Sequence, residues 1–486
     1  DPDVIRVEDT YYMVSTTMHF MPGCEILQSF DLVHWEHVTY VYETLDHTDA
    51  QQLKSGQNIY GQGMWAASLR YHEGRFYICF VANDTRKTYL YTSEKIDGPW
   101  KKQLIEGFYH DGSLLFDEDG RSYIVYGNDE IWITELNEDL TAPKKDGLHR
   151  LLVSDHKNPE LGYEGSHIQK INGYYYIFLV HSLRDRWMRT EACFYSDSLE
   201  GEFTGGDVLC DDRGYCGQGV AQGGIVDTPD GKWYAMLFQD SGAVGRIPIL
   251  LPVTWKDHFP FFGQNGHVPE EIEVHSTRPG YIYQPLVGSD DFCNGLLPRW
   301  QFNHDPDPRY YHLDALQGTY TITTREVCTE LTQAVNTLTQ RMSYPSCAAE
   351  VTVDASALKE GDVAGLCALQ GCYAAVGITK HHGKYEVLML DKKEDGILDM
   401  TEGTVVESHQ MDFRLEADFC NMKDEARCYY RVNKGDWLPI GTVHKLYFKL
   451  DHFTGCRFGL FCYAAEETGG SACFRDFKYY DVDEIS

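Results

Sequence analysis

Residues 110–126 read HDGSLLFDEDGRSYIVY, in which an Asp-Gly-Ser triplet precedes an apolar run, an Asp-Gly turn and an aromatic run. Two such runs separated by a glycine-containing turn are typical of a β-hairpin. Asp111 stands directly before the first run. An aspartate before glycine is most often a turn residue, so the stretch indicates more than a turn only if it recurs in the chain.

The hairpin pattern occurs five times in the first half of the chain. Each copy has an apolar run, a turn of Asp, Asn or Glu and a second strand rich in aromatic residues. A second phrase adds one more strand to three of the units: SFDLVHW at 29–35, SEKIDGPW at 93–100 and SDSLEGEF at 196–203. Strand units that repeat every 40–65 residues or so indicate the blades of a β-propeller, here five blades over roughly residues 1–265.

The triplets before the first strands of the five units can be compared, because the innermost strand of every blade lines the central channel. They are DPD at 1–3, AAS at 66–68, DGS at 111–113, EGS at 164–166 and QGG at 222–224. Their first residues should face one cavity, and three of these are the carboxylates Asp1, Asp111 and Glu164. Three acids at equivalent positions favour a shared function, although each alone could simply cap a turn.

Convergent carboxylates suit glycoside hydrolysis, in which one acid protonates the leaving oxygen and one base activates water. A third carboxylate nearby would raise the pKa of the acid by like-charge repulsion. Three carboxylates also suit a Ca²⁺ site, which is the competing interpretation. The Trp and Tyr residues around the same loops favour the stacking of a sugar over the binding of a cation.

The chain has 42 basic and 74 acidic residues, a formal charge of −32. Such a surface repels phosphate backbones and anionic lipid, so we expect no nucleic-acid or membrane partner. A neutral substrate such as an oligosaccharide agrees best with this charge, although a charge kept only for solubility is an equal alternative. The sequence has no apolar run of about 18 residues, so no transmembrane span is predicted. The sequence does not determine the oligomeric state.

The 15 cysteines include no CxxC pair. Several lie inside apolar strands, such as Cys79 and Cys462, and we interpret them as buried free thiols. Free thiols predict a reducing compartment, and no signal peptide is visible, so a cytoplasmic location is expected over secretion. The chain begins at Asp1, in the middle of the first repeat pattern. The sequence therefore leaves open whether a segment precedes Asp1.

The ordered motifs of the chain resemble family 43 of the glycoside hydrolases, and more narrowly its two-domain β-xylosidases and α-L-arabinofuranosidases. These motifs are DPDVIRVEDTYYMVSTTMHFMPGCEILQSFDLVHW, GMWAASLRYHEGRFY, HDGSLLFDEDGRSYIVYG, YEGSHIQKINGYYYIF and GAVGRIP. The resemblance implies an all-β fold and inverting, exo-acting release of β-D-xylose or α-L-arabinofuranose from xylo-oligosaccharides or arabinoxylan. The two pentoses present similar hydroxyls, so the sequence does not rank the two activities.

The second part of the chain differs from the first. From residue 289 the hairpin phrase is absent and alternating strands such as AAEVTVDAS and KYEVLML occur. DDFCNGLLPRWQFNHDPDP and LTQRMSYPSCAAEVTVDAS resemble the C-terminal β-sandwich of the same family members. We therefore predict a five-bladed catalytic propeller at 1–267, a linker at 268–288 and a β-sandwich, a concanavalin-like jelly roll, at 289–486.

The resemblance also implies roles for individual residues. The general base falls on Asp1, the pKa-tuning and orienting aspartate on Asp111, and the general acid on Glu164. The substrate-binding positions that it implies are Trp65 and Ala66 (walls of the terminal-sugar subsite), Arg246 (a hydrogen-bond donor to the sugar), Met18, His19 and Phe20 (a hydrophobic pocket wall), Gln222 (where many relatives have a His that contacts substrate or a central cation) and Phe453 (the tip of a sandwich loop that closes the pocket). For Arg246 a propeller-closing salt bridge, and for Met18 a core role, remain alternatives.

No cofactor is expected from the resemblance, and a structural or central Ca²⁺ remains open. Gln222 in place of His weakens the expectation of a channel Ca²⁺. Asp291 and Asp476 could join a structural Ca²⁺ site, but exposed aspartates at strand ends are commoner. Two rival functions also remain: a propeller fructosidase that retains configuration through a nucleophilic aspartate, and a catalytically silent sugar-binding propeller.

Overall fold

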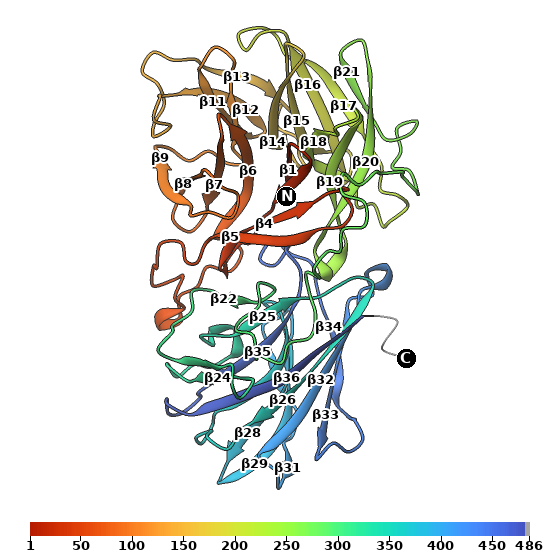
Figure 1. Cartoon of the computed structure of the whole chain (residues 1–486). Coiled ribbons are helices and arrows are strands. Elements are labelled where there is room, and N and C mark those ends of the chain that lie inside the picture. Colours follow the sequence, from red (N-terminus) through yellow and green to blue (C-terminus); the bar gives the residue numbers. More distant parts are fainter. Residues whose placement is uncertain (482–486) are drawn as a thin grey trace.

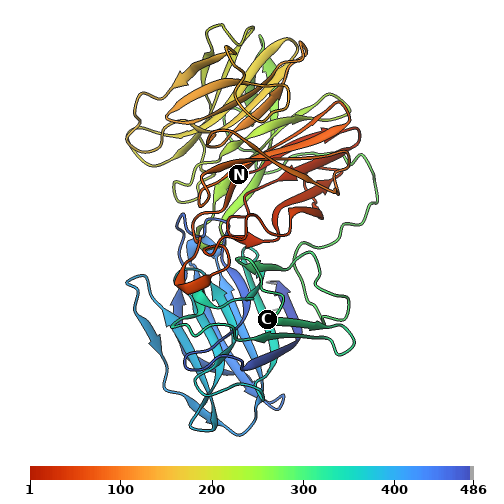
Figure 2. The same cartoon turned by 90° about the vertical axis from the view of Figure 1, so that its left-hand side faces the viewer.

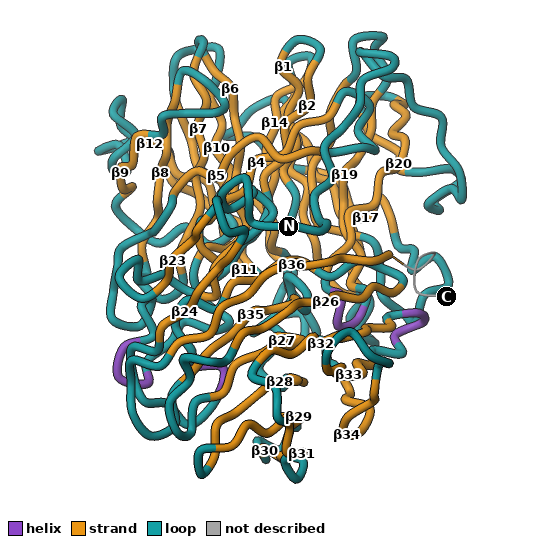
Figure 3. Tube along the Cα trace, turned by 60° about the horizontal axis from the view of Figure 1, so that its bottom comes forward, coloured by secondary structure: helices purple, strands orange, loops and turns teal. Residues whose placement is uncertain are grey.

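The computed structural model describes residues 1–481, and residues 482–486, the end of the predicted second domain, lie outside the described residues. Two bodies made of strands are stacked in Figure 1, with the red-to-green N-terminal body above the green-to-blue C-terminal body. Figure 3 shows strands and loops nearly everywhere and only short helical turns. These turns are η1 (Lys54–Gly56), η2 (Gly242–Val244), η3 (Leu331–Gln333) and η4 (Cys420–Met422).

The N-terminal body contains five antiparallel sheets of four strands each, so the prediction of a five-bladed propeller is confirmed. Blade 1 has β1 (Asp3–Val7), β2 (Thr10–Val14), β4 (Gly23–Ser29) and β5 (Glu36–Tyr42). Blade 2 has β6 (Met64–His72), β7 (Arg75–Ala82), β8 (Lys87–Ser93) and β9 (Lys101–Ile105). Blade 3 has β10 (Ser113–Phe116), β11 (Ser122–Asn128), β12 (Glu130–Leu136) and β13 (His149–Ser154). Blade 4 has β14 (Glu164–Ile171), β15 (Tyr174–Ser182), β16 (Arg189–Ser196) and β17 (Thr204–Leu209). Blade 5 has β18 (Ala221–Asp227), β19 (Trp233–Asp240), β20 (Arg246–Lys256) and β21 (Phe259–Phe262).

The C-terminal body is a sandwich of two sheets, as predicted. One sheet has β3 (Phe20–Met21), β22 (Gln301–Asn303), β25 (Leu338–Arg341), β27 (Val363–Leu369), β28 (Ala374–His381), β29 (Lys384–Lys392), β30 (Leu398–Met400), β31 (Thr404–Val406) and β35 (Arg457–Tyr463). The other has β23 (Tyr311–Asp314), β24 (Thr319–Thr323), β26 (Ser346–Asp354), β32 (Gln410–Asp418), β33 (Glu425–Val432), β34 (Leu438–Lys445) and β36 (Ser471–Asp481).

Strand β3 belongs to the propeller chain but pairs with the sandwich. Met21 and Phe20 lie opposite Phe302 and Asn303 of β22. The two bodies therefore share a sheet instead of only touching, and Figure 2 shows them in contact below blade 1. This continuity fixes the sandwich relative to the first blade.

Apolar side chains fill the spaces between neighbouring blades. Ile78 and Tyr89 of blade 2 pack toward blade 1, and Ile177 and Leu179 of blade 4 pack toward blade 3. All four are fully buried. Side chains alternate between the two faces of each strand, and the apolar faces are buried against the next blade. The inner strands can therefore carry polar residues along the axis.

The triplets at the start of the inner strands have an unusual backbone. In blades 2, 4 and 5 the first strand contains one extra residue relative to its partner, and the extra residues lie between Trp65 and Ser68, between Glu164 and His167, and between Ala221 and Gly224. A β-bulge re-aims the neighbouring side chains. Gly165 and Gln222 have positive φ values of 66° and 64°. In these three blades the triplet is thus a bulge that re-aims side chains at the start of the inner strand.

The third residue of the first three triplets joins its blade to the next one. The side-chain oxygen of Asp3 accepts a hydrogen bond from the Leu69 N–H (2.7 Å). Ser68 Oγ accepts from Leu114 N–H (3.1 Å) in the same way. Ser113 Oγ accepts from the N–H of Ile168 in blade 4 (3.0 Å). The polar third position therefore has a structural role that the sequence analysis did not assign.

Arg70 of blade 2 completes this axial network. Its guanidinium donates to Asp3 Oδ2 (2.7 Å), to the Leu114 carbonyl (2.8 Å), to Ser113 Oγ (2.7 Å) and to the Ile168 carbonyl (3.3 Å). The side chains of Arg70 and Asp3 are 13% and 2% exposed. One buried ion pair with additional hydrogen bonds thus links four of the five blades.

The described cysteines are free, and most of those inside strands, including Cys79 and Cys462, are buried, as predicted. Among residues 1–481 no helical segment has the length and apolar character needed to cross a bilayer.

Removing the axial guanidinium should destabilise the fold. In Arg70→Met the buried Asp3 loses its cationic partner, so the free energy of unfolding should fall by about 3–5 kcal/mol. Urea unfolding followed by tryptophan fluorescence measures this. The control is D3N/R70M, which leaves an amide acceptor for the Leu69 N–H and no charge, and should be more stable than R70M alone. Equal stability of R70M and the unchanged protein would contradict a central role for Arg70.

Candidate functional site

Asp1 and Asp111 border one small cavity on the propeller axis, together with Gly165, the residue after Glu164. The triplets of blades 1, 3 and 4 therefore meet at one place, as the repeat predicted. Asp111 is nearly buried and has a positive φ of 48°, so its backbone turns the carboxylate toward blade 4. There Asp111 Oδ2 accepts a hydrogen bond from the Gly165 N–H (2.9 Å).

The carboxylate of Asp1 is held at both oxygens. Thr16 Oγ1 donates to Oδ2 (2.5 Å), and Arg246 Nη1 donates to Oδ1. Arg246 also donates through Nε to Asp240 Oδ1 (3.2 Å), and Arg189 Nε donates to the other oxygen of Asp240 (3.1 Å). Positive and negative groups thus alternate along a buried chain that ends at Asp1.

Two donors face one oxygen of Glu164. Asn128 Nδ2 donates to Glu164 Oε2 (2.7 Å), and His110 Nε2 lies 3.4 Å from the same oxygen. His110 Nε2 is also 3.6 Å from Asp111 Oδ2. The Glu164 side chain is 19% exposed, against 6% for Asp111. Glu164 is therefore the more accessible of these two neighbouring carboxylates.

The electrostatics of this group differ from the sequence-based prediction, in which Asp111 raises the pKa of Glu164. Burial does raise the pKa of Glu164, but the hydrogen bond and charge of His110, with the charges of Arg189 and Arg246, lower it below its ordinary value. The pKa of His110 is raised to about 9, chiefly by the charge of Asp111. Burial and the charge of Glu164 raise the pKa of Asp111. The prediction omitted His110, which offsets the repulsion between the two acids.

The sandwich contributes directly to the site through Phe453. Its ring lies 4.0 Å from the Arg246 guanidinium carbon and contacts Trp65 edge to face at 5.3 Å. A Cβ atom on Gly245 would lie only 2.6 Å from the Gly455 nitrogen, so glycine is needed where the sandwich loop meets the propeller. The structure thus places Phe453, Trp65 and Arg246 together, and Ala66, partly exposed, follows Trp65 in the bulge of β6.

Gln222 lies on the axis but is buried. Its backbone N–H donates to Glu191 Oε2 (2.7 Å), and burial raises the pKa of Glu191 well above its ordinary value. A Cβ atom on Gly165 would lie 2.6 Å from Gln222 Cγ, so the glutamine side chain packs tightly against the Glu164 triplet. Gln222 therefore supports the loop of Glu164 from blade 5.

Met18, His19 and Phe20 do not line an open pocket, and the structure corrects this prediction. All three are completely buried at the junction with the sandwich. The His19 ring packs against His304 and His452 at 4.8 and 5.4 Å, and Arg457 lies 3.5 Å above the Phe20 ring. The pairing of β3 with β22 buries Phe20 against the sandwich, and Met18 is covered by Met64 and Thr454, the neighbours of Trp65 and Phe453. For Met18 the core role is the correct one.

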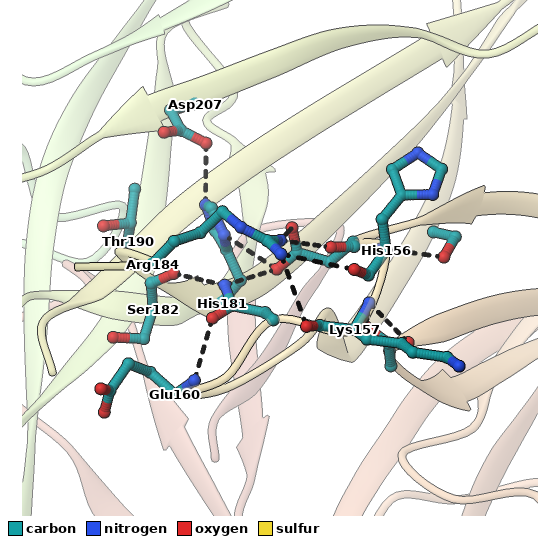
Figure 4. A network of polar contacts seen from close by, with 12 residues as sticks. His156, Lys157, Glu160, His181, Ser182, Arg184, Thr190 and Asp207 are labelled. Atoms are coloured by element: carbon teal, nitrogen blue, oxygen red, sulfur yellow. Dashed lines mark hydrogen bonds and ion pairs between the residues drawn. The ribbon is translucent and has the colours of Figure 1, made fainter. Parts of the chain in front are cut away.

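The loop that leads into Glu164 is tied to the next hairpin by a polar network, shown in Figure 4. His181 lies between Asp155 Oδ2 (3.2 Å) and Asp207 Oδ1 (2.8 Å). Burial is the largest single effect on its pKa and lowers it, but the two carboxylates together raise the pKa above its ordinary value. Arg184 Nη1 donates to the Asp155 carbonyl (2.6 Å). The approach to the acid is therefore fixed by contacts within blade 4 and its preceding loop.

One group of three potential metal ligands is found in residues 1–481. His110, Asp111 and Glu164 each place one nitrogen or oxygen within 4.8 Å of the others. The group offers a cation one imidazole nitrogen and two carboxylate oxygens, and Glu164 Oε2 already accepts a hydrogen bond from Asn128 and faces His110. Asp291 and Asp476 belong to no such group, and Asp291 Oδ1 instead accepts a hydrogen bond from the Cys293 N–H (2.9 Å).

A larger cavity of about 560 Å³ lies on the other side of Asp1. Arg246 and Phe453 line it, but neither Asp111 nor Glu164 does. It runs between blade 1 and blade 5 toward Leu286 of the linker. This cavity therefore adjoins the predicted base and not the predicted acid.

Sequence reasoning missed several residues that hold the site. Thr16, Asn128, Arg189 and Asp240 come from strands or loops that no repeat position marked. His110 directly precedes Asp111, and its place beside a triplet carboxylate was the one available signal. The other four become visible only when the blades close into a ring.

Comparisons with known proteins agree with this architecture. Residues 1–260 match the model of glycosyl hydrolases family 43, and residues 289–480 match the β-xylosidase C-terminal concanavalin A-like domain. A β-xylosidase from Formosa agariphila is 26% identical over 99% of this chain and 87% of its own length. A xylosidase/arabinosidase 43B from Humicola insolens is 25% identical over 99% of this chain and 95% of its own.

A solved structure also superimposes on the whole chain. It is described as a bifunctional GH43-CE protein from Bacteroides eggerthii, with 42% identity and a TM-score of 0.91, and covers all of this chain. The chain spans 62% of that protein. The family predicted from the motifs is thereby confirmed: this chain belongs to family 43 of the glycosyl hydrolases and carries the family's concanavalin-like C-terminal domain.

Proposed function

We propose that the protein is an inverting exo-glycosidase that releases terminal β-D-xylose or α-L-arabinofuranose from xylo-oligosaccharides or arabinoxylan. The observation that carries the proposal is that Asp1, Asp111 and Gly165, the residue after Glu164, border one axial cavity. Arg246 donates to Asp1, and its charge also acts on Asp111 and Glu164. The names of the relatives, β-xylosidase and xylosidase/arabinosidase, support a pentose as the sugar released.

Asp1 serves as the general base in this proposal. Thr16 and Arg246 both donate to its carboxylate, which favours the negatively charged form and fixes its orientation. It takes a proton from the water that attacks the anomeric carbon on the face opposite the leaving group. Glu164 protonates the departing glycosidic oxygen, and Asp111 raises the proton affinity of its neighbours and orients the sugar.

The exo mode rests on the contact between the two bodies. Phe453 from the sandwich reaches Arg246 and Trp65, so aromatic surface closes one side of the site. A closed end suits a single terminal sugar, and aromatic faces suit its apolar ring surface. The chemistry requires no cofactor. The free thiols support a cytoplasmic location as part of the same proposal.

The direct test uses the two nitrophenyl pentosides, β-D-xyloside and α-L-arabinofuranoside, measured side by side, with the product anomer followed by NMR at early times. We expect hydrolysis of at least one and a first-formed sugar of inverted configuration, because a base and not a nucleophile faces the anomeric carbon. A retained configuration would favour the fructosidase-like alternative. Binding without hydrolysis would favour the silent sugar-binding propeller.

The roles of Glu164 and Asp1 can be separated by the leaving group. Glu164→Gln removes a proton donor, so kcat/KM should fall steeply, by about 10²–10⁴-fold, on an oligosaccharide whose leaving group needs protonation. An activated aryl glycoside should lose much less. D1N is the matched control and should lower kcat/KM by the same factor on both substrates, since both reactions need the attack of water. The assignment fails if both variants lose the same factor on both substrates.

Asp111 should set the descending, high-pH limb of the kcat/KM profile. Its charge raises the pKa of His110 and adds repulsion to Glu164. Both effects favour the protonated forms of His110 and Glu164. In Asp111→Asn these groups should lose their protons at lower pH, so the descending limb should move to lower pH. A profile of kcat/KM from pH 4 to 10 measures this. An unmoved limb with lower activity would leave Asp111 as a sugar-binding residue only.

A further inference from the structure

His110 has no role in the proposed reaction, yet it contacts the reacting carboxylate. Its Nε2 atom lies 3.4 Å from Glu164 Oε2 and 3.6 Å from Asp111 Oδ2, so one nitrogen faces both acids. The side chain is 23% exposed, which leaves the ring in contact with solvent. His110 therefore connects the proton-donating oxygen of Glu164 with the water outside.

The charged groups around the pair come from four blades. Asp111 and Glu164 face His110 directly, while Arg86 at the turn before β8 adds a weaker positive charge to His110. Arg189 and Arg246 act on Glu164 from blades 4 and 5. Asn128 donates to Glu164 Oε2 (2.7 Å) and supports its carboxylate form. These surroundings favour the form in which Glu164 is charged and the proton is on His110.

We propose that His110 stores the proton that Glu164 delivers to the leaving group, so that the two residues act as one acid. The inference takes the identity of the reaction from the proposed function. The location of the proton on His110 does not depend on that function. His110 is in this view a proton-relay residue, and Glu164 remains the group that touches the substrate.

The proton transfers balance over one turnover. The proton on His110 Nε2 passes to the charged Glu164 carboxylate, and Glu164 passes it on to the glycosidic oxygen as the C–O bond breaks with its electron pair on that oxygen. Asp1 takes one proton from the attacking water. Afterwards Asp1 releases its proton to solvent, and the neutral His110 imidazole takes one from solvent. The net reaction is hydrolysis, with no proton gained or lost by the protein.

The relay predicts the opposite pH effect from a simple positive charge. Two groups that share one proton lose it only above the higher of their two pKa values, here that of His110, at about 9. In His110→Gln, Glu164 holds its proton alone, so the descending limb of kcat/KM should move to lower pH by about one unit or more. If His110 acted by charge alone, its removal would raise the pKa of Glu164, and the limb would move to higher pH. Movement to higher pH, or no movement, overturns the proposal.

Asn128→Ala is the matched control. It removes the other donor to Glu164 Oε2 but no proton-holding group. Activity should fall, and the descending limb should keep the position that it has in the unchanged enzyme. A limb that moves down as far in N128A as in H110Q would mean that loss of a Glu164 contact, and not of a stored proton, causes the shift, and would overturn the relay.

NMR of the histidine rings tests the proton's location without any activity. The His110 signal, assigned by its absence in H110Q, should report a protonated ring at pH 7 that titrates near pH 9. In Glu164→Gln the same signal should titrate at lower pH. A neutral His110 at pH 7 overturns the proposal. If the nitrophenyl pentosides are not hydrolysed but His110 is protonated at pH 7, the proposed function fails and the shared proton stands.

Discussion

Arg70 lies on the propeller axis, where its guanidinium donates to Asp3 of blade 1, to Ser113 of blade 3 and to a carbonyl of blade 4. Asp3 and Ser113 each stand two residues after a site carboxylate. The contacts of Arg70 therefore fix the backbone from which Asp1 and Asp111 extend. A buried ion pair is stabilising only if its remaining hydrogen bonds are made, and here the neighbouring inner strands provide them. The position of the site depends on this one group.

The site lies where propeller and sandwich meet, and backbone geometry explains how the two bodies come so close. Strand β3 extends the sandwich sheet, and the facing glycines Gly245 and Gly455 let the loop of Phe453 approach Arg246. Because of these contacts the C-terminal body forms part of the wall. A propeller without the sandwich would leave Arg246 without its aromatic neighbour.

Charge balance determines which acid keeps its proton. The repulsion between Asp111 and Glu164 is offset by His110, Arg189 and Arg246, which lower the pKa of Glu164, while the charge of Asp111 raises the pKa of His110. On the other side of the site, Arg246 joins Asp1 to Asp240, and Arg189 adds a second positive charge beside Asp240. The two carboxylates proposed as acid and base thus touch different basic side chains, His110 beside Glu164 and Arg246 beside Asp1, although both come from the same position of a repeat. Different partners at equivalent positions allow one scaffold to support two opposite roles.

The sequence by itself determined the five blades, the sandwich and the meeting of Asp1, Asp111 and Glu164, because the period of a repeat reports which positions are equivalent, and a propeller brings equivalent positions to one axis. Only the tertiary structure decided the partners of these residues. Thr16, Asn128 and Asp240 occupy unrelated positions of their blades, and no period marks them. His19 and Phe20 were misplaced for the same reason, since a two-residue strand pairs with a partner some 280 residues away in the chain. The relative pKa values of His110, Asp111 and Glu164 depend on distances between blades. These distances are set when the ring of blades closes, and the local sequence does not encode them.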